Sequence, residues 1–149
     1  MQVLWIGRLA LSGATLAWMG LIFYLSSLSQ AEASQPLESP VFSWLGVLRS
    51  YVAHIVLYGV LATLAQASLW GWNSDYRLRW ALAAAAFSAL YGISDEYHQS
   101  LVGRSGSIAD VIVNAFGAIA ATGCLWIVGL WWRRAFSLHL RRDGPERPG

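Results

Sequence analysis

Charged residues are placed so unevenly along this chain that they leave four long segments without any charge. A helix needs about 20 apolar residues to cross the hydrocarbon core of a bilayer, and about 17–25 is the usual range. Three of the segments meet this length, and the helix of the shorter one can continue into the polar sequence that follows it. In chain order, the uncharged segments are residues 9–31, 50–74, 80–94 and 111–132.

This pattern predicts an all-α, integral membrane bundle of four transmembrane helices. The helices are expected over residues 9–27, 52–70, 79–97 and 109–131. The composition supports this class, because 56% of the residues are hydrophobic and only 12% are charged, whereas soluble domains carry about 25% charged residues. A disordered chain would need low hydrophobicity and much charge. The single Cys124 excludes a disulfide scaffold.

The basic residues, all of them arginines, predict how the bundle is oriented. Four spans place both termini on one side, and that side holds every arginine except Arg49 and Arg104. Cytoplasmic segments carry the positive excess, so both termini are expected in the cytoplasm. The net charge of +2 is small and scattered along the chain, so no nucleic-acid partner is expected.

The chain is expected to divide into a membrane domain over residues 1–132 and a basic cytoplasmic tail over residues 133–149. The tail ends in proline and glycine, and it is predicted to be disordered. The first span has an alternative interpretation. Arg8, the apolar run and Ala31-Glu32-Ala33 also fit a signal peptide with its cleavage site. Cleavage would leave the rest of the topology unchanged.

With this topology, polar residues of all four helices collect at the extracytoplasmic end of the bundle. Carboxylates are costly inside a membrane helix and by default mark a functional site. Asp110 and Asn114 are four residues apart and share a helix face. The candidates for acid–base chemistry are Asp95, Glu96, His98, Asp110 and His54. The candidates for binding a substrate or an anion are Ser27, Tyr58, Gln99, Arg104, Ser105 and Asn114.

Carboxylates together with imidazoles are the groups used in general acid–base catalysis. Asp95 and His98 are three residues apart and could present both groups on one helix face. The acidic and histidine residues could also bind a divalent metal, but they lack a recognised ligand spacing such as H-x-x-x-H, so no cofactor is predicted. The segment 103–107 could hold an anion at the start of the last helix with Arg104, or it could be a tight turn.

Each candidate also has a structural interpretation. His54 could be a core histidine with satisfied hydrogen bonds, and Asn114 could join two helices. Asp110 could cap its helix, because a carboxylate there accepts backbone N–H bonds and opposes the helix dipole. An acidic residue of the third helix could pair with Arg104 and fold the loop. The arrival of all these groups at one depth is what favours a site.

Four blocks of sequence carry a resemblance to a known family. In chain order they are Phe23-Tyr24-Leu25-Ser26-Ser27, His54-x-x-x-Tyr58-x-x-Leu61, Tyr91-Gly92-x-Ser94-Asp95-Glu96-x-His98-Gln99 and Arg104-Ser105-Gly106-Ser107-x-x-Asp110-x-x-x-Asn114-x-x-Gly117. Together they resemble the VanZ-like family over about residues 18–123. The chain departs from the family at residues 50–53, where members usually carry charge. It departs again at Val102-Gly103, where members commonly have Pro-Gly.

The resemblance implies a multi-pass protein of the bacterial plasma membrane, in contact with its lipids and with a role in the cell envelope. The founding member is associated with low-level teicoplanin resistance. An effect on glycopeptide susceptibility is therefore part of the expectation, although resistance itself is not carried over. Two functions stay open: a membrane protein that binds an envelope ligand such as a lipid-linked precursor, and a membrane enzyme that uses the Asp/Glu/His set on a lipid-linked or cell-wall substrate. The sequence does not predict the oligomeric state.

Overall fold

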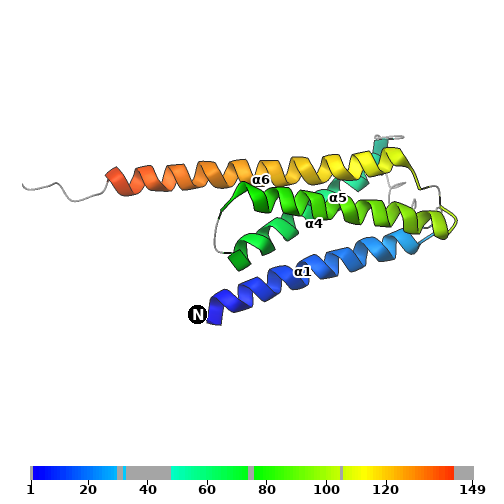
Figure 1. Ribbon diagram of the computed structural model, residues 1–149, viewed down its shortest axis with the longest axis horizontal. Coiled ribbons are helices and arrows are strands. Elements are labelled where there is room, and N and C mark those ends of the chain that lie inside the picture. The colour runs from blue at the N-terminus through cyan, green and yellow to red at the C-terminus, as the bar shows by residue number, and fades with distance from the viewer. Residues whose placement is uncertain (1, 30–31, 33–47, 74–75, 105, 143–149) are drawn as a thin grey trace, which may run out of the picture.

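The computed structural model describes residues 2–29, 32, 48–73, 76–104 and 106–142, with side chains described between residues 5 and 135 of these ranges. Over these residues the chain is all-α and forms a bundle of four helices (Figure 1). In chain order the helices are α1 (Gln2–Ser27), α4 (Leu48–Asn73), α5 (Leu78–Leu101) and α6 (Ile108–Arg142). The all-α prediction is confirmed, and each expected span falls on one helix.

Three of these helices are long and apolar enough to cross a membrane. The apolar segments are Trp5–Ser27, Leu48–Asn73 and Ile108–Ala135. The helix α5 has 24 residues, but its last two turns carry Asp95, Glu96 and His98. Of the described helices, α5 is the one that these polar residues exclude from the apolar set. The other three helices identify the chain as a membrane protein.

The helix α4 makes the most extensive contacts in the bundle, first with α6 and then with α1 and α5. It approaches α6 closely at Gly117, where an added Cβ atom would lie 2.7 Å from the backbone oxygen of Ile55. On the facing side, an added Cβ at Gly59 would lie 3.4 Å from the backbone oxygen of Gly117. Small residues let membrane helices approach closely enough for their backbones to touch. Gly117 therefore fixes how α4 and α6 sit against each other.

The surface of the bundle is apolar, whereas its interior is partly polar. Large aliphatic side chains such as Leu16, Leu90 and Ile119 are more than half exposed, while Gln66 and Ser88 are completely buried. Such a surface suits hydrocarbon, which offers no hydrophobic driving force between helices. Close packing and interhelical hydrogen bonds must therefore hold the bundle together.

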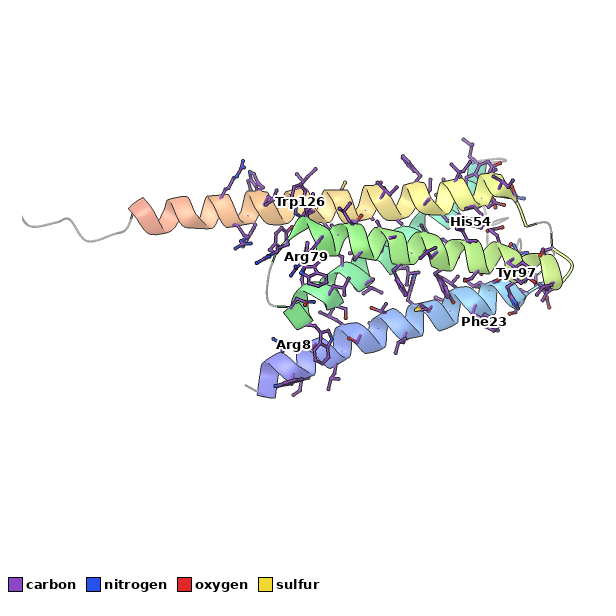
Figure 2. All side chains as sticks on the ribbon, in the orientation of Figure 1. Arg8, Phe23, His54, Arg79, Tyr97 and Trp126 are labelled. Atoms are coloured by element: carbon purple, nitrogen blue, oxygen red, sulfur yellow. The ribbon has the colours of Figure 1, made fainter. Side chains whose placement is uncertain are left out.

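Arginines and tryptophans collect at one end of the bundle. The guanidinium of Arg8 lies 5.4 Å from the ring centre of Trp5 and 5.8 Å from that of Trp72. Tryptophans and basic residues are typical of membrane interfaces, so this end has the composition of one. Figure 2 shows this end, marked by Arg8, Arg79 and Trp126, and the opposite end, marked by Phe23, His54 and Tyr97.

The helix α6 extends further than the sequence pattern predicted. Its end was expected at residue 131, with a disordered tail over 133–149, whereas α6 continues to Arg142. The reason is that residues 133–142 contain no glycine or proline to break the helix. The first part of the expected tail is thus helical. Residues 143–149, as well as Ala31 and Ala33 of the cleavage motif, lie outside the described residues.

Candidate functional site

Four helix ends meet at one end of the bundle and bring the candidate residues together. The helices α1 and α5 end there, at Ser27 and Leu101, and the helices α4 and α6 begin there, at Leu48 and Ile108. Figure 1 shows this end at the turn that joins α5 to α6. We call it the polar end, because the buried Asp95, Glu96, Gln99 and Asn114 all lie near it.

The carboxylate of Glu96 is the centre of a hydrogen-bonded network at the polar end. Its side chain is almost completely buried. The Oε2 atom accepts a bond from the backbone N–H of Ser107 at 3.2 Å, and the Oε1 atom accepts one from the side-chain amide of Asn114 at 3.4 Å. The Nδ1 atom of His54 lies 3.9 Å from the same Oε1. These four residues are called the Glu96 network below.

The imidazole of His54 is held in place by Asn114. The Nδ1 atom of His54 lies 2.9 Å from the amide oxygen of Asn114. Because an amide oxygen can only accept hydrogen bonds, this contact makes Nδ1 the protonated nitrogen of the ring. Asn114 is itself fixed, since it is fully buried and packs against Gly92 of α5. The ring orientation of His54 is therefore set by its neighbours.

The turn between α5 and α6 is shaped to bring the Ser107 N–H to Glu96. Gly103 has a φ of +80°, a left-handed conformation that favours glycine. An added Cβ at Gly106 would lie 2.5 Å from the backbone oxygen of Glu96, so a side chain does not fit there. The hydroxyl of Ser107 accepts a bond from the Ala109 N–H at 3.0 Å and caps α6. The described part of this segment is a tight turn, and Glu96 already uses its Ser107 N–H.

Asp110 adds a second carboxylate beside the network. It lies in the first turn of α6, and one ligand atom each from His54, Glu96 and Asp110 come within 4.8 Å of one another. These three residues could hold a divalent cation, because carboxylates and imidazoles are common metal ligands. In this structure Nδ1 of His54 and both oxygens of Glu96 already have hydrogen-bond partners in the protein.

A pocket of about 330 Å³ lies next to the network, between α1, α4 and α5. This volume is within the range of small-molecule sites, about 300–1,000 Å³. Its polar lining includes Ser26, His54, Tyr58, Asp95, Gln99 and Arg104. Its apolar lining comes mainly from α1 and α4 and includes Ile22, Leu25, Val52, Val56 and Leu57. The pocket is therefore amphiphilic, with charged groups on one part of its wall and hydrocarbon on another.

Asp95 and His98 do not share a face in the way that their spacing suggested. The carboxylate of Asp95 is buried, lines the pocket and accepts a bond from Gln99 at 3.0 Å. The ring of His98 instead stacks on Phe23, with ring centres 4.6 Å apart, and its Nε2 lies 3.0 Å from the hydroxyl of Ser27. His98 thus connects α5 to α1, while Asp95 faces the pocket.

The structure sorts the predicted residues into three groups. His54, Glu96, Asp110 and Asn114 form or adjoin the network. The pocket is lined by Tyr58, Asp95, Gln99 and Arg104, together with His54. Ser27 and His98 form a separate contact between α1 and α5, and Ser105 lies outside the described residues.

Three polar residues that line the pocket were missing from the predicted site residues, namely Ser26, Arg49 and Ser50. Arg49 lines the pocket because α4 begins at Leu48, earlier than the expected start at residue 52, which places Arg49 in its first turn. A signal existed, since Arg49 and Arg104 were the two arginines assigned to this end of the bundle. Ser26 also lines the pocket and is buried, whereas its neighbour Ser27 is exposed.

Comparison with known proteins identifies a family. The family model described as VanZ/LLP1 matches residues 12–129. This range includes all the residues of the Glu96 network and of the pocket, so the predicted resemblance is confirmed. No curated protein and no solved structure matches the chain.

Proposed function

We propose a function for this chain, which belongs to the VanZ/LLP1 family because the family model matches residues 12–129. The protein spans the bacterial plasma membrane four times, with both termini in the cytoplasm. Its pocket at the polar end binds a lipid-linked ligand of the cell envelope. The amphiphilic lining of the pocket is the observation that carries this proposal.

The fourth span is supported by the packing of α5. This helix contacts α4 and α6 extensively and α1 as well, and its exposed side chains Leu82, Phe87, Leu90 and Ile93 are apolar. A helix inside such a bundle crosses the membrane together with its neighbours. The arginine-rich end then faces the cytoplasm, because positive charge accumulates on that side.

Labelling of single cysteines tests both the span count and the orientation. In a Cys124→Ala background, we expect a membrane-impermeant maleimide to label Val102→Cys in intact cells. Asn73→Cys should react only after the cytoplasm is opened, because α5 separates the two positions. Both native side chains are exposed, so neither substitution disturbs the interior. Labelling of both positions from one side contradicts the fourth span, and the reverse pattern contradicts the orientation.

An amphiphile fits the pocket better than a purely polar or purely apolar molecule. Charged side chains of Asp95 and Arg104 line one part of the wall, and Ile22, Val52 and Val56 line another. A purely polar ligand would leave the apolar wall without a partner, and a hydrocarbon would bury the charges unpaired, which is costly. A lipid-linked ligand has a polar group that can face the charged wall and a hydrocarbon chain that can face the apolar wall.

The cellular pools of lipid-linked cell-wall precursors test this function. We expect deletion of the gene to change these pools, wild-type protein to restore them, and Asp95→Asn to fail at equal abundance. The substitution removes the negative charge of Asp95 from the pocket but keeps an oxygen that can accept the Gln99 bond. Ser94→Ala is the matched control, because Ser94 is exposed and its hydroxyl bonds to Tyr91 of its own helix. Mass spectrometry of lipid extracts measures the pools.

Pools that are unchanged by deletion, or that Asp95→Asn restores fully, contradict the proposal. A change in glycopeptide susceptibility is expected only where the pools themselves change. This part of the proposal follows from the family's association with the cell envelope.

A catalytic role is the second candidate function, and the geometry of His54 favours it. His54 lines the pocket, and Asn114 holds its Nδ1 beside Glu96. A base oriented by a second residue is the arrangement of general acid–base and nucleophilic catalysis. An enzyme would release a chemically altered ligand from purified protein, whereas a binding protein would release it unchanged.

A further inference from the structure

We propose that the pocket recognises the phosphate group of a membrane lipid through Arg104 and Ser26, with the hydrocarbon chain of the lipid along the apolar wall formed by α1 and α4. This inference rests on the proposed function, because it specifies the chemical class of the lipid-linked ligand.

Unpaired hydrogen-bond donors in the pocket wall are the first observation. Ser26 is only 3% exposed, and its hydroxyl has no hydrogen-bond partner among the described residues. The Nε atom of Arg104 is also buried and without a partner, although another nitrogen of its guanidinium bonds to the Leu25 carbonyl at 3.3 Å. Buried polar groups are nearly always paired, so each exception requires an explanation. Both groups can donate a hydrogen bond, so a ligand rich in acceptor oxygens would satisfy them.

The charge of the pocket is the second observation. Arg49 and Arg104 both line it, against the single carboxylate of Asp95. That carboxylate already accepts a hydrogen bond from the side-chain amide of Gln99. The Nε–H of Arg104 is therefore a charged donor in the pocket wall that a ligand could engage. Guanidinium groups pair with phosphate through short, charge-assisted hydrogen bonds.

The apolar wall identifies the source of the phosphate as a lipid. Ile22 of α1 and Leu57 of α4 are inside the bundle, whereas Val52 and Val56 of α4 are 37% and 53% exposed on its apolar surface. The pocket lining is therefore continuous with the surface that faces hydrocarbon. The hydrocarbon chain of a lipid whose phosphate lies at Arg104 can follow this wall out to the surrounding lipid. A free phosphate ion would have no use for an apolar wall.

Lipid binding to the purified full chain in nanodiscs of zwitterionic lipid tests the inference. The probes are phosphatidic acid, the diacylglycerol of the same acyl chains, and inorganic phosphate. We expect phosphatidic acid to bind at least about tenfold more tightly than diacylglycerol, because a hydrogen bond to a charged group contributes that much. Inorganic phosphate at millimolar concentration should not displace it.

Two variants locate the binding to the pocket. Arg104→Gln should weaken phosphatidic acid binding by about tenfold or more, whereas Arg79→Gln removes the same charge at the opposite end of the bundle (Figure 2) and should change nothing. Ser26→Ala should weaken binding several-fold without lowering the thermal stability of the unliganded protein, since the lost hydroxyl has no partner there. If Ser26 had only a structural role, its loss would lower the thermal stability instead. The Ser26→Ala variant also keeps the test decisive if Arg104→Gln does not fold.

Equal binding of phosphatidic acid and diacylglycerol overturns the inference, as does equal weakening by Arg104→Gln and Arg79→Gln. Displacement by inorganic phosphate alone overturns its lipid part. If these tests fail while Asp95→Asn still leaves the precursor pools unrestored, the proposed function stands and only the phosphate chemistry is wrong.

Discussion

Replacing Gly117 with valine should separate α4 from α6 and lower the unfolding free energy of the protein more than any other single change discussed. An added Cβ would lie 2.7 Å from the oxygen and 2.9 Å from the Cα of Ile55. These are backbone atoms that cannot rotate away, so the helices must move apart. Overpacking typically costs about 1–3 kcal/mol, and a backbone contact places this case at the upper end or above. Denaturant titration of the purified protein measures the change.

Gly123→Val is the matched control on the same helix. A Cβ at Gly123 would have nothing within 4 Å, so this variant introduces the same side chain without a clash. We expect it to unfold like the wild type, within about 0.5 kcal/mol, as is usual for surface substitutions. Equal stability of the two variants would show that α4 and α6 do not pack through Gly117.

Asn114→Leu should produce the second largest loss of stability. Leucine has nearly the shape of asparagine but no polar atoms, so it removes the acceptor of His54 and a donor to Glu96 together. Each buried polar group left unpaired costs about 1–3 kcal/mol, and we expect a total of about 2–4 kcal/mol. The same denaturant titration measures it. In a double-mutant cycle with His54→Leu, contacting residues should couple by more than about 0.5 kcal/mol.

Thr122→Val controls for the loss of a buried polar group on α6. The hydroxyl of Thr122 is buried, and among the described residues its hydrogen bonds go to carbonyls of its own helix, at Ala118 and Ile119. Its removal leaves no group of another helix unpaired, so its effect should be much smaller than that of Asn114→Leu. Equal effects of the two variants would mean that the Glu96 network contributes nothing between helices.

Much of the fold could be predicted because it depends on where charged residues fall along the sequence. A bilayer requires a fixed length of uncharged helix, and the charges of this chain mark those lengths directly. The same topology places the ends of neighbouring spans together, so the convergence of His54, Glu96 and Asp110 at one end followed from the sequence. The structure places these three side chains close together.

Which residues of the polar end face the pocket and which face the Glu96 network could not be predicted in the same way. Asp95 and Glu96 are adjacent and differ by about 100° around their helix, so one faces the pocket and the other faces α6. Which residue faces which partner depends on the rotation of α5 within the bundle. That rotation is set by contacts such as Gly92 against Asn114. The helical periodicity of the sequence does not predict these contacts.

The early start of α4 shows a second limit. Hydropathy placed the helix at residue 52, because Arg49 is charged and therefore counted as outside the span. The backbone does not stop where hydrocarbon stops, and α4 begins at Leu48. Arg49 consequently lies on a helix in the pocket wall instead of in a loop.

The uninterrupted length of α6 determines which parts of the chain it connects. Its 35 residues make a rod of about 52 Å at about 1.5 Å per residue, whereas hydrocarbon is about 30 Å thick. The exposed Trp131 and Trp132 stand where such a rod would leave the lipid, and the helix continues beyond them to Arg142. One unbroken helix therefore connects Asn114, near the polar end, to the segment beyond Trp132 at the other end. The Glu96 network and the segment that projects past the bilayer thus belong to the same element of secondary structure, with no loop between them.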